Sequence, residues 1–488
     1  MAFTPNVKSI HYQHQAAKWT KIQTLMNGED GIKAAGELYL PKLSGQTDTE
    51  YESYKTRGTF FNAFSRTIAG LSGAIIRKEM TIKTNSKIKS LLQNVTLAGE
   101  SVQEVTRMII DNVLSYGYYG ILSDMAPMKN PDEVMTDNPY WALYDCTSIL
   151  NFEIKQLGDE NKLIMLALAE VVYNKMPDNP LVLVATDQIR LMEIDKDGFL
   201  VVKIYQKKKD TTTTGEEIWA QYGDDLFPQI RGKRLDFIPF VFFGSMSNNP
   251  IPTAPPLLDL ANLNIKHWQV SVDYYHGLHY CAMPTPWAAG FPNSTVLYIG
   301  AMKAWVSEDA DAKCGFLEFS GQGLGAIEKA LNNLEKQMAV MGSRMLEEQK
   351  RAAEAAETVS MRYSGDSATL SSVVNSVEQG LIKAIDMLGA WLVIEPSTEV
   401  KLNRDFVAQK LSPQEITALL QAWQACAISL DTFLYNLSVG EVLPAQRTID
   451  DEKKLIEITA PDKSAFNNNF VEDETNKIIN LKAFNGEK

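Results

Sequence analysis

The sequence has little cysteine and little histidine: its 488 residues include four cysteines and five histidines. The cysteines are widely separated, with no C-x-x-C pair and no histidine at zinc-finger spacing. They are Cys146, Cys281, Cys314 and Cys426. This spacing excludes a zinc finger and predicts free thiols in a reducing compartment.

Long apolar runs are also missing. No stretch reaches the roughly 18 consecutive apolar residues that span a bilayer. The first residues, MAFTPNVKSIHYQHQ, lack a basic segment followed by an apolar one. We therefore expect neither a membrane span nor a signal peptide. With 45% hydrophobic and 22% charged residues, the chain is expected to fold into two to four well-cored domains.

An excess of basic residues is missing as well, because the net charge is −13. Proteins that grip nucleic acid usually carry a basic footprint, so this charge argues against a tight DNA-binding protein. It leaves open a protein that handles DNA loosely.

The motifs of nucleotide and acyl chemistry do not occur. There is no G-x-x-x-x-G-K-[ST] loop for ATP, and the glycines from Gly321 to Gly325 have the wrong spacing for a dinucleotide fingerprint. The segment Gly70-Leu71-Ser72-Gly73 is not the G-x-S-x-G elbow of an esterase. We expect no enzymatic activity and no cofactor.

The most informative pattern that is present is a narrow apolar stripe in residues 326–353, with spacings of four and three. The stripe consists of Ile327, Leu331, Leu334, Met338, Met341 and Met345. It predicts a helix of roughly 40 Å, at 1.5 Å per residue, packed lengthwise against neighbours while the rest of its surface stays polar.

Further helices are predicted at residues 7–26, 60–78, 101–116, 257–280, 367–392 and 412–460. Ser101 and Glu104 form a capping box at the third of these, and Ser412-Pro413 starts the last. The helix at 367–392 carries a second apolar stripe. Its members are Leu370, Val374, Val377, Leu381, Ile385 and Leu388.

Strands are predicted at residues 117–124, across most of 140–245, and at 399–406. Asp195 to Gly198 is similar to a fragment of a calcium loop, but the downstream ligands are missing, so the sequence favours a hairpin turn. The fold class is therefore α+β, mainly helical. An α/β body is followed by a long helix, a small insert, a second long helix, a linker and a third helix that returns to the body.

Two clusters invite a functional interpretation. His276 and His279, with Asp273, could share a metal on one helix face, as in a hydrolase; packing of a hydrogen-bonded histidine among aromatic residues is the favoured alternative. The basic residues Arg344, Lys350, Arg351 and Arg362 are interleaved with glutamates, so by charge alone they predict a salt-bridged surface.

Several segments together carry a resemblance to a known family. They are LYLPKL with Tyr51, Tyr54 and Arg57; LSYGYYGILSDMAP; QIRLMEIDKDG; FIPFVFFG; PPLLDLANLNIKHWQVSVDY with MPTPWAAG; and EAAETVS before SATLSSVVNSVEQGL. In these segments the chain resembles the portal proteins of tailed bacteriophages, specifically the uncharacterised-domain portal group of podovirus-like phages.

The resemblance implies a ring-forming portal fold with a wing, a two-helix stem, an α/β clip and a helical crown. The implied parts are residues 1–255 and 367–405 (wing), 256–280 and 325–350 (stem helices), 281–324 (clip), 351–366 (tunnel loop) and 406–488 (crown and tail). The stripe on residues 326–353 would then pack the stem. Arg344, Lys350, Arg351, Arg362 and Tyr363 become candidates for proximity to DNA.

The resemblance also implies the assembly. About twelve copies would form a ring at one capsid vertex, through which double-stranded DNA is packaged and ejected. The implied partners are the terminase large subunit, then the head-to-tail adaptor, and the major capsid and scaffolding proteins. The implied location is the virion, with the host cytoplasm during assembly. The alternative to a portal is another virion component, such as a scaffold or tail adaptor. It would be held together by the same helices but would form oligomers without a hole wide enough for DNA.

Overall fold

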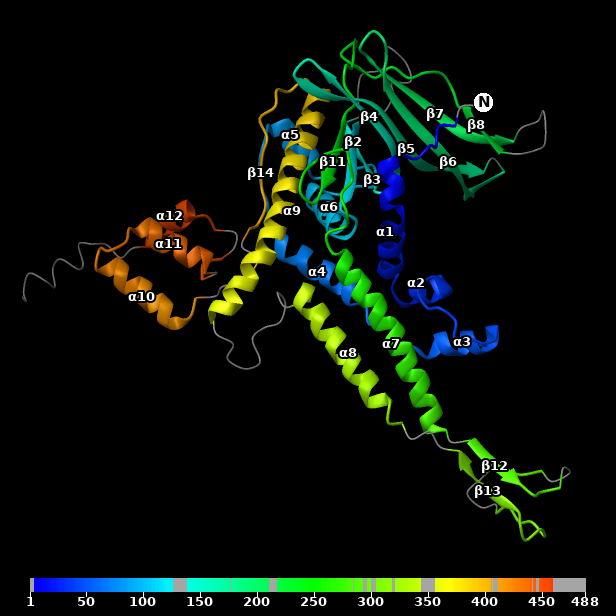
Figure 1. Cartoon of the computed structure of the whole chain (residues 1–488). Helices are drawn as coiled ribbons and strands as arrows, with labels where there is room; N and C mark the ends of the chain where they lie inside the picture. The colour runs from blue at the N-terminus through cyan, green and yellow to red at the C-terminus, as the bar shows by residue number, and fades with distance from the viewer. Residues whose placement is uncertain are drawn as a thin grey trace, which may run out of the picture. The chain divides into compact units, whose positions relative to one another are not determined.

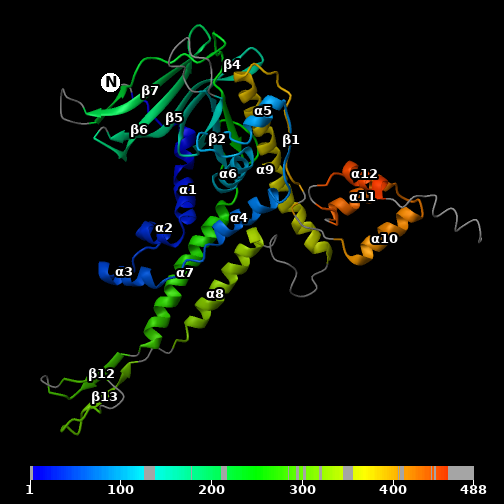
Figure 2. The same cartoon turned by 180° about the vertical axis from the view of Figure 1, so that it is seen from behind.

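The computed structural model describes residues 4–125, 138–176, 178–209, 217–283, 285–292, 296–299, 304–317, 321–343, 356–404, 406, 411–440, 442–444 and 447–459. The chain divides into two compact units, Met1–Arg404 and Asp405–Lys488. Figures 1 and 2 show the elements from opposite sides.

The first unit begins with short helices. They are α1 (Ile10–Met26), α2 (Gly28–Ala35), a 3₁₀ turn (Gly36–Leu38), α3 (Asp48–Arg57), α4 (Ala63–Ile75), α5 (Ser86–Leu91) and α6 (Val102–Tyr116). The predicted capping box of α6 is confirmed, because the Ser101 hydroxyl accepts from the Glu104 amide and the Glu104 carboxylate accepts from the Ser101 amide. The predictions at 7–26 and 60–78 correspond to α1 and α4, whereas α2 and α3 were not predicted.

A three-stranded antiparallel sheet forms the centre of this unit. Its order is β11-β2-β3, from β2 (Tyr118–Asp124), β3 (Tyr140–Asp145) and β11 (Phe240–Gly244). Every residue of β11 is buried, as are all but the last of β2, which confirms the predicted buried strand at 117–124.

The five-stranded sheet continues the β region. It has the order of the chain, β4 (Ile149–Leu157), β5 (Glu160–Met176), β6 (Asn179–Ile194), β7 (Leu200–Lys209) and β8 (Glu217–Gln221). The turn at Asp195–Gly198 joins β6 to β7, with the Asp195 amide donating to the Phe199 carbonyl at 2.7 Å. The hairpin interpretation is therefore confirmed. Two small ladders pair β9 (Gln229–Ile230) with β10 (Lys233–Arg234) and β1 (Thr81–Lys83) with β14 (Glu399–Lys401).

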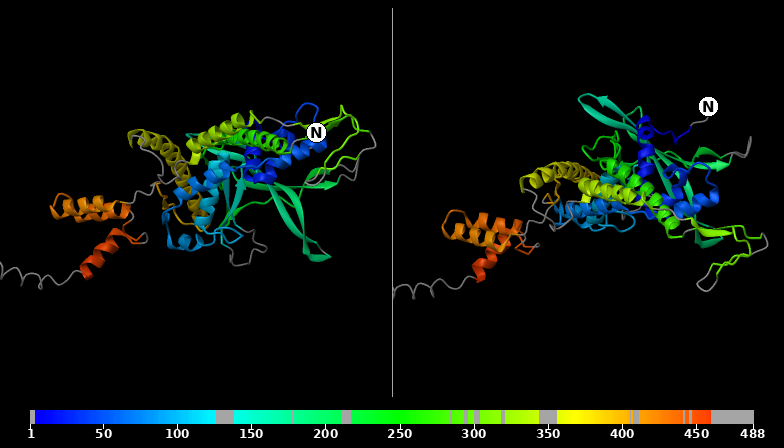
Figure 3. Two further views of the ribbon diagram at one scale, coloured as in Figure 1. Left: turned by 90° about the horizontal axis from the view of Figure 1, so that it is seen from below. Right: turned by 60° about the horizontal axis from the view of Figure 1, so that its bottom comes forward.

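Two helices and a small sheet form the part seen in the lower half of Figure 1. Helix α7 (Leu258–Ala282) and helix α8 (Leu324–Met338) lie side by side, and β12 (Thr285–Ala289) pairs with β13 (Lys313–Leu317) at their far end. Figure 3 shows the same pairing of the helices from two further directions. The helix predicted at 257–280 is confirmed.

The long helix predicted at 326–353 is interrupted. Helix α8 ends at Met338, and a π-helical turn follows over Ala339–Ser343. Residues 344–353 lie outside the described residues, so the structure supports a helix of 15 residues and not the full predicted length.

Helix α9 (Ala356–Trp391) starts well before the predicted position, Ser367. It runs beside β11, β2 and α6, and its distal end is fixed by two indole groups. Trp391 Nε1 donates to the Ser123 carbonyl at 3.0 Å, and Trp141 Nε1 donates to the Ala384 carbonyl at 3.3 Å. All six residues of the predicted stripe on this helix are buried.

The second unit contains α10 (Pro413–Gln424), α11 (Leu430–Val439) and α12 (Ile449–Thr459), in agreement with the helical prediction for 412–460. Ser412 and Glu415 form a capping box with Pro413 in the first turn. Trp423 and Phe433 stack at a centroid distance of 5.3 Å. Neither α10 nor α12 has a buried residue within the described part of this unit. Across the described residues of the whole chain, no helix combines the length and apolar character that crossing a bilayer requires.

Candidate functional site: the α7–α8 hairpin

Helices α7 and α8 approach closely because α7 has a glycine where they meet. A Cβ atom added to Gly277 would lie 2.8 Å from Leu324 Cδ2, which is closer than a side chain tolerates. Further along, the buried His267 faces Glu335 of α8, with 3.3 Å between Nε2 and Oε1. The two helices therefore form one antiparallel hairpin.

The stripe of α8 is buried to different depths along its length. Ile327, Leu331 and Leu334 are half-buried, and Met338 is 2% exposed. Helix α7 lies alongside α8, so pairing within one chain accounts for this burial without a second copy. Met345 lies outside the described residues.

The buried stripe does not continue to Met341, whose side chain is 45% exposed. A π-helical turn has more residues per turn than an α-helix, so Ala339–Ser343 shifts the phase of the pattern. Gly342 occupies the inward position instead: a Cβ atom there would lie 2.3 Å from Thr67 Cγ2 of α4 and 3.2 Å from Leu260 Cδ2 of α7. Met341 is therefore largely exposed in the single chain, and its packing against neighbouring copies in the stem stays a prediction.

The outer face of α8 carries no large apolar side chain. It consists of Gly325, Glu328, Lys329, Asn332, Asn333 and Lys336. All of these are exposed. The distal half of α7 differs, because Tyr275 and Leu278, which lie three positions apart on one side of the helix, are 42% and 36% exposed. The outer face of α8 is thus polar, whereas the distal half of α7 exposes aromatic and aliphatic side chains.

The small sheet at the end of the hairpin exposes large apolar side chains. Trp287 is 44% exposed, Phe316 56% and Leu317 61%. Two-stranded sheets are marginally stable alone in water. This end of the hairpin is therefore suited to be covered by a partner.

The histidine pair is held by an arginine. Arg57, the last residue of α3, directs Nη1 to His276 Nδ1 at 3.3 Å and Nη2 to His279 Nε2 at 3.2 Å. The guanidinium fills the position between the imidazoles that a shared cation would need, so the packing alternative is favoured over the metal hydrolase. No group of three His, Cys, Asp or Glu side chains suited to a metal occurs among the described residues.

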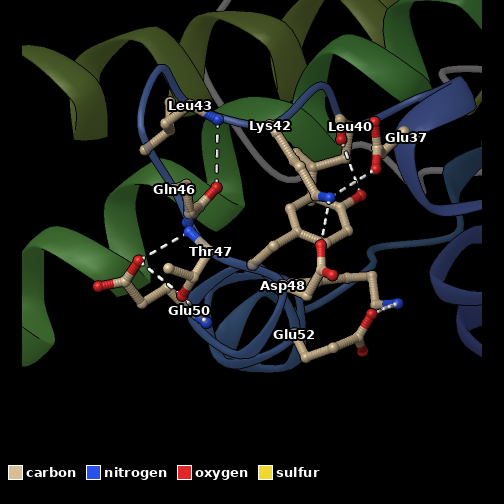
Figure 4. A network of polar contacts seen from close by, with 11 residues as sticks. Glu37, Leu40, Lys42, Leu43, Gln46, Thr47, Asp48, Glu50 and Glu52 are labelled. Carbon is tan, nitrogen blue, oxygen red and sulfur yellow. Dashed lines mark hydrogen bonds and ion pairs between the residues drawn. The ribbon is translucent and has the colours of Figure 1, made fainter.

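The remaining contacts of α3 show what Tyr51, Tyr54 and Arg57 do in the fold. Tyr54 donates its hydroxyl to Asp273 Oδ1 of α7 at 2.5 Å, and burial, followed by Asp273, raises the pKa of the phenol. Tyr51 donates to the Leu40 carbonyl at 2.8 Å (Figure 4). All three side chains therefore fix α3 and its preceding loop.

Figure 4 shows the polar network of that loop. Lys42 pairs with Asp48 at 2.6 Å and Glu37 at 3.0 Å, and the hydrogen bond that Lys42 donates to Asp48 contributes most to raising the Lys42 pKa. Thr47 and Glu50 form a capping box at the start of α3, which lowers the Glu50 pKa. The loop and α3 thus form one folded segment beside α7.

The predicted DNA-contact residues are not brought together by the described structure. Arg344, Lys350 and Arg351 lie outside the described residues, while Arg362 and Tyr363 lie in the first turns of α9. Two further basic residues, Lys329 and Lys336 of α8, are exposed and were not among the sequence candidates. Neither lysine has an acidic residue three or four positions away, so the absence of intrahelical pairing partners was the available signal.

Part of the chain matches one family model. Residues 256–392 match the model of a family described as "Domain of unknown function (DUF4055)". The matched range extends from the beginning of α7 to the end of α9. The chain matches none of the curated proteins.

Solved structures of low similarity include chains of gene transfer agent (GTA) particles. A chain of the native GTA virion is 12% identical, with a TM-score of 0.39, covering 84% of this chain and 98% of that one. A chain of the native GTA neck with C12 symmetry is 12% identical, with a TM-score of 0.38, covering 83% of this chain and 98% of that one. A chain of the neck of the empty GTA particle is 12% identical, with a TM-score of 0.37, covering 80% of this chain and 91% of that one. This likeness carries no argument about function.

Proposed function

We propose that the protein is a phage portal: a ring of about twelve copies at one capsid vertex, forming the channel for packaging and ejection of double-stranded DNA. The observation that carries the proposal is the α7–α8 hairpin, which extends from an α/β body and ends in a small sheet. The sequence motifs that resemble portal proteins support it independently.

The proposal assigns residues 1–255 and 367–405 to the wing, 256–280 and 325–350 to the stem, 281–324 to the clip and 406–488 to the crown and tail. The tunnel loop proposed for residues 351–366 would be shorter than that range, because residues from Ala356 onward are helical. Arg362 and Tyr363 would therefore approach DNA from the start of α9 and not from a loop.

The two flanks of the hairpin suit different surroundings in such a ring. The polar outer face of α8 is compatible with a hydrated channel, and the exposed Tyr275 and Leu278 of α7 are suited to contact protein. Each copy has a net charge of −13, so most of the wall would repel phosphates and DNA would meet no deep electrostatic trap. Lys329 and Lys336 would supply local contacts only.

The proposed partners follow from the exposed surfaces. The apolar side chains on β12 and β13 would be covered by the terminase large subunit during packaging and by the head-to-tail adaptor afterwards. The wing would contact the major capsid and scaffolding proteins. The protein itself would hydrolyse nothing, because the packaging ATPase is a separate protein in this scheme.

Electron microscopy of the purified protein, combined with native mass spectrometry, tests the proposal. We expect closed rings of about twelve copies with a central hole wider than the roughly 20 Å of duplex DNA. A monomer or dimer that persists at high concentration would contradict the portal proposal. Oligomers without a hole would instead support a scaffold or tail adaptor.

A further inference from the structure

The end of α3 is attached to α7 by a contact whose chemistry depends on protonation. A guanidinium group only donates hydrogen bonds, so both imidazole nitrogens that face Arg57 must be acceptors. A protonated imidazole carries hydrogen on both nitrogens and has no acceptor left. The contact therefore requires uncharged His276 and uncharged His279.

Charge works in the same direction as hydrogen bonding. Protonation of both histidines would place three positive groups together within hydrogen-bond distance. The other ionisable groups that face the pair among the described residues are Asp273, Tyr54 and Tyr280. Asp273 is the only anion among them, and its Oδ1 already accepts from Tyr54, so one carboxylate would face three cations.

The rest of the α3 segment is held mainly by its own contacts. Those of Lys42, Tyr51 and Thr47 lie within residues 37–52, and α7 adds a hydrogen bond from Gln269 Nε2 to the Tyr39 carbonyl at 2.7 Å. The last turn of α3 lies against α7 at Tyr54, which donates to Asp273, and at Arg57, and a Cβ atom on the following Gly58 would lie 2.4 Å from Val272 Cγ2. Loss of the Arg57 contact would therefore loosen the end of α3 where it meets α7.

We propose that Arg57, His276 and His279 form a proton-sensitive latch that holds α3 on α7 at neutral pH and releases it on acidification. The latch is a property of the single chain and does not depend on ring formation. An imidazole in water is half protonated near pH 6.5, so release belongs to the range below about pH 6.

The electrostatic environment of His276 also favours its uncharged form. Burial, followed by the charge of Arg57 and by His279, lowers the pKa of His276. A group whose pKa is lowered on folding contributes stability above its unfolded pKa, and this contribution is lost as the pH falls through the folded value. Acidification therefore weakens the α3–α7 contact.

Hydrogen–deuterium exchange of the full chain at pH 7.5 and pH 5.5, with labelling times corrected for intrinsic exchange, tests the latch. We expect amides of residues 48–57 to exchange at least tenfold faster at pH 5.5, while peptides of α9 stay unchanged. The His276→Gln/His279→Gln variant keeps two carbonyl acceptors for Arg57 but cannot titrate in this range. It should be equally protected at both pH values.

Two further variants keep the test decisive. His14→Gln removes an exposed histidine on α1 and should retain the wild-type response. Arg57→Gln should leave α3 poorly protected at both pH values, even if the double histidine variant does not fold. Equal protection of wild-type α3 at both pH values, or equal acceleration in α9, would overturn the proposal.

Discussion

Helices α8 and α9 carry the same apolar pattern but are buried to different extents. All six stripe residues of α9, from Leu370 to Leu388, are at most 3% exposed. On α8, Ile327, Leu331 and Leu334 are only half-buried. The spacing of apolar residues thus identifies the face of a helix that packs, but the number of neighbouring elements determines how deeply that face is buried.

The neighbours of the two helices explain the difference. Helix α9 packs against β11, β2, α6 and β14, so its stripe is enclosed from several directions. Helix α8 has α7 along one side and a polar face on the other. In the proposed ring, the half-buried side chains of α8 could gain further contacts, whereas those of α9 could not.

The largest expected effect comes from truncating one leucine on each helix. Leu381→Ala leaves a cavity at a site that is fully buried and should lower the free energy of unfolding by about 2–5 kcal/mol. Leu331→Ala removes a half-buried side chain and should cost about 1 kcal/mol. Urea denaturation of both variants, followed by tryptophan fluorescence, measures the two values.

Ring formation would sharpen this first comparison. If the half-buried face of α8 gains contacts from a neighbouring copy, Leu331→Ala should cost more in assembled rings than in the dissociated chain. Equal costs for Leu331→Ala and Leu381→Ala in the dissociated chain would contradict the difference in burial.

Glycine substitutions give a smaller effect with opposite signs on the two helices. A Cβ atom at Gly380 of α9 would lie 2.3 Å from Phe243 Cε1, so Gly380→Ala should destabilise the chain by about 1–3 kcal/mol. No atom lies within 4 Å of a Cβ atom at Gly325 of α8. Gly325→Ala should therefore stabilise α8 by up to about 1 kcal/mol through helix propensity.

Thermal unfolding by calorimetry distinguishes these outcomes, with a lower melting temperature for Gly380→Ala and a slightly higher one for Gly325→Ala. A stabilised Gly380→Ala would mean that Phe243 can move away at little cost. It would show that the core around α9 is less rigid than the contacts indicate.

Local features of the fold could be predicted because neighbouring residues determine them. The capping box at Ser101 and Glu104 and the turn closed by Gly198 depend on groups a few positions apart. The phase shift at Met341 could not be predicted, since a π-helical turn is set by how Gly342 packs on Thr67 and Leu260.

The environment of the histidine pair was equally beyond the sequence pattern. His276 and His279 were recognised as neighbours on one helix, but their partner Arg57 lies more than 200 positions away in the chain. The charge that decides between a metal site and a hydrogen-bonded pair comes from this distant residue. Motif spacing alone therefore left both alternatives open.

The smallest expected difference concerns one glutamate on each helix. Glu378 of α9 is buried and accepts from the Leu402 amide at 2.7 Å and from Arg404 at 2.5 Å, so Glu378→Gln should cost about 1–3 kcal/mol. Glu335 of α8 has a side chain that is 52% exposed and faces His267, so Glu335→Gln should cost less than about 0.5 kcal/mol.

Urea denaturation at pH 7.5 in low and high salt measures both costs. Because salt screens exposed ion pairs more than buried ones, the cost at Glu378, whose carboxylate is buried, should persist at high salt. A salt-sensitive Glu378→Gln would place this carboxylate in contact with water and remove the contrast between the two helices.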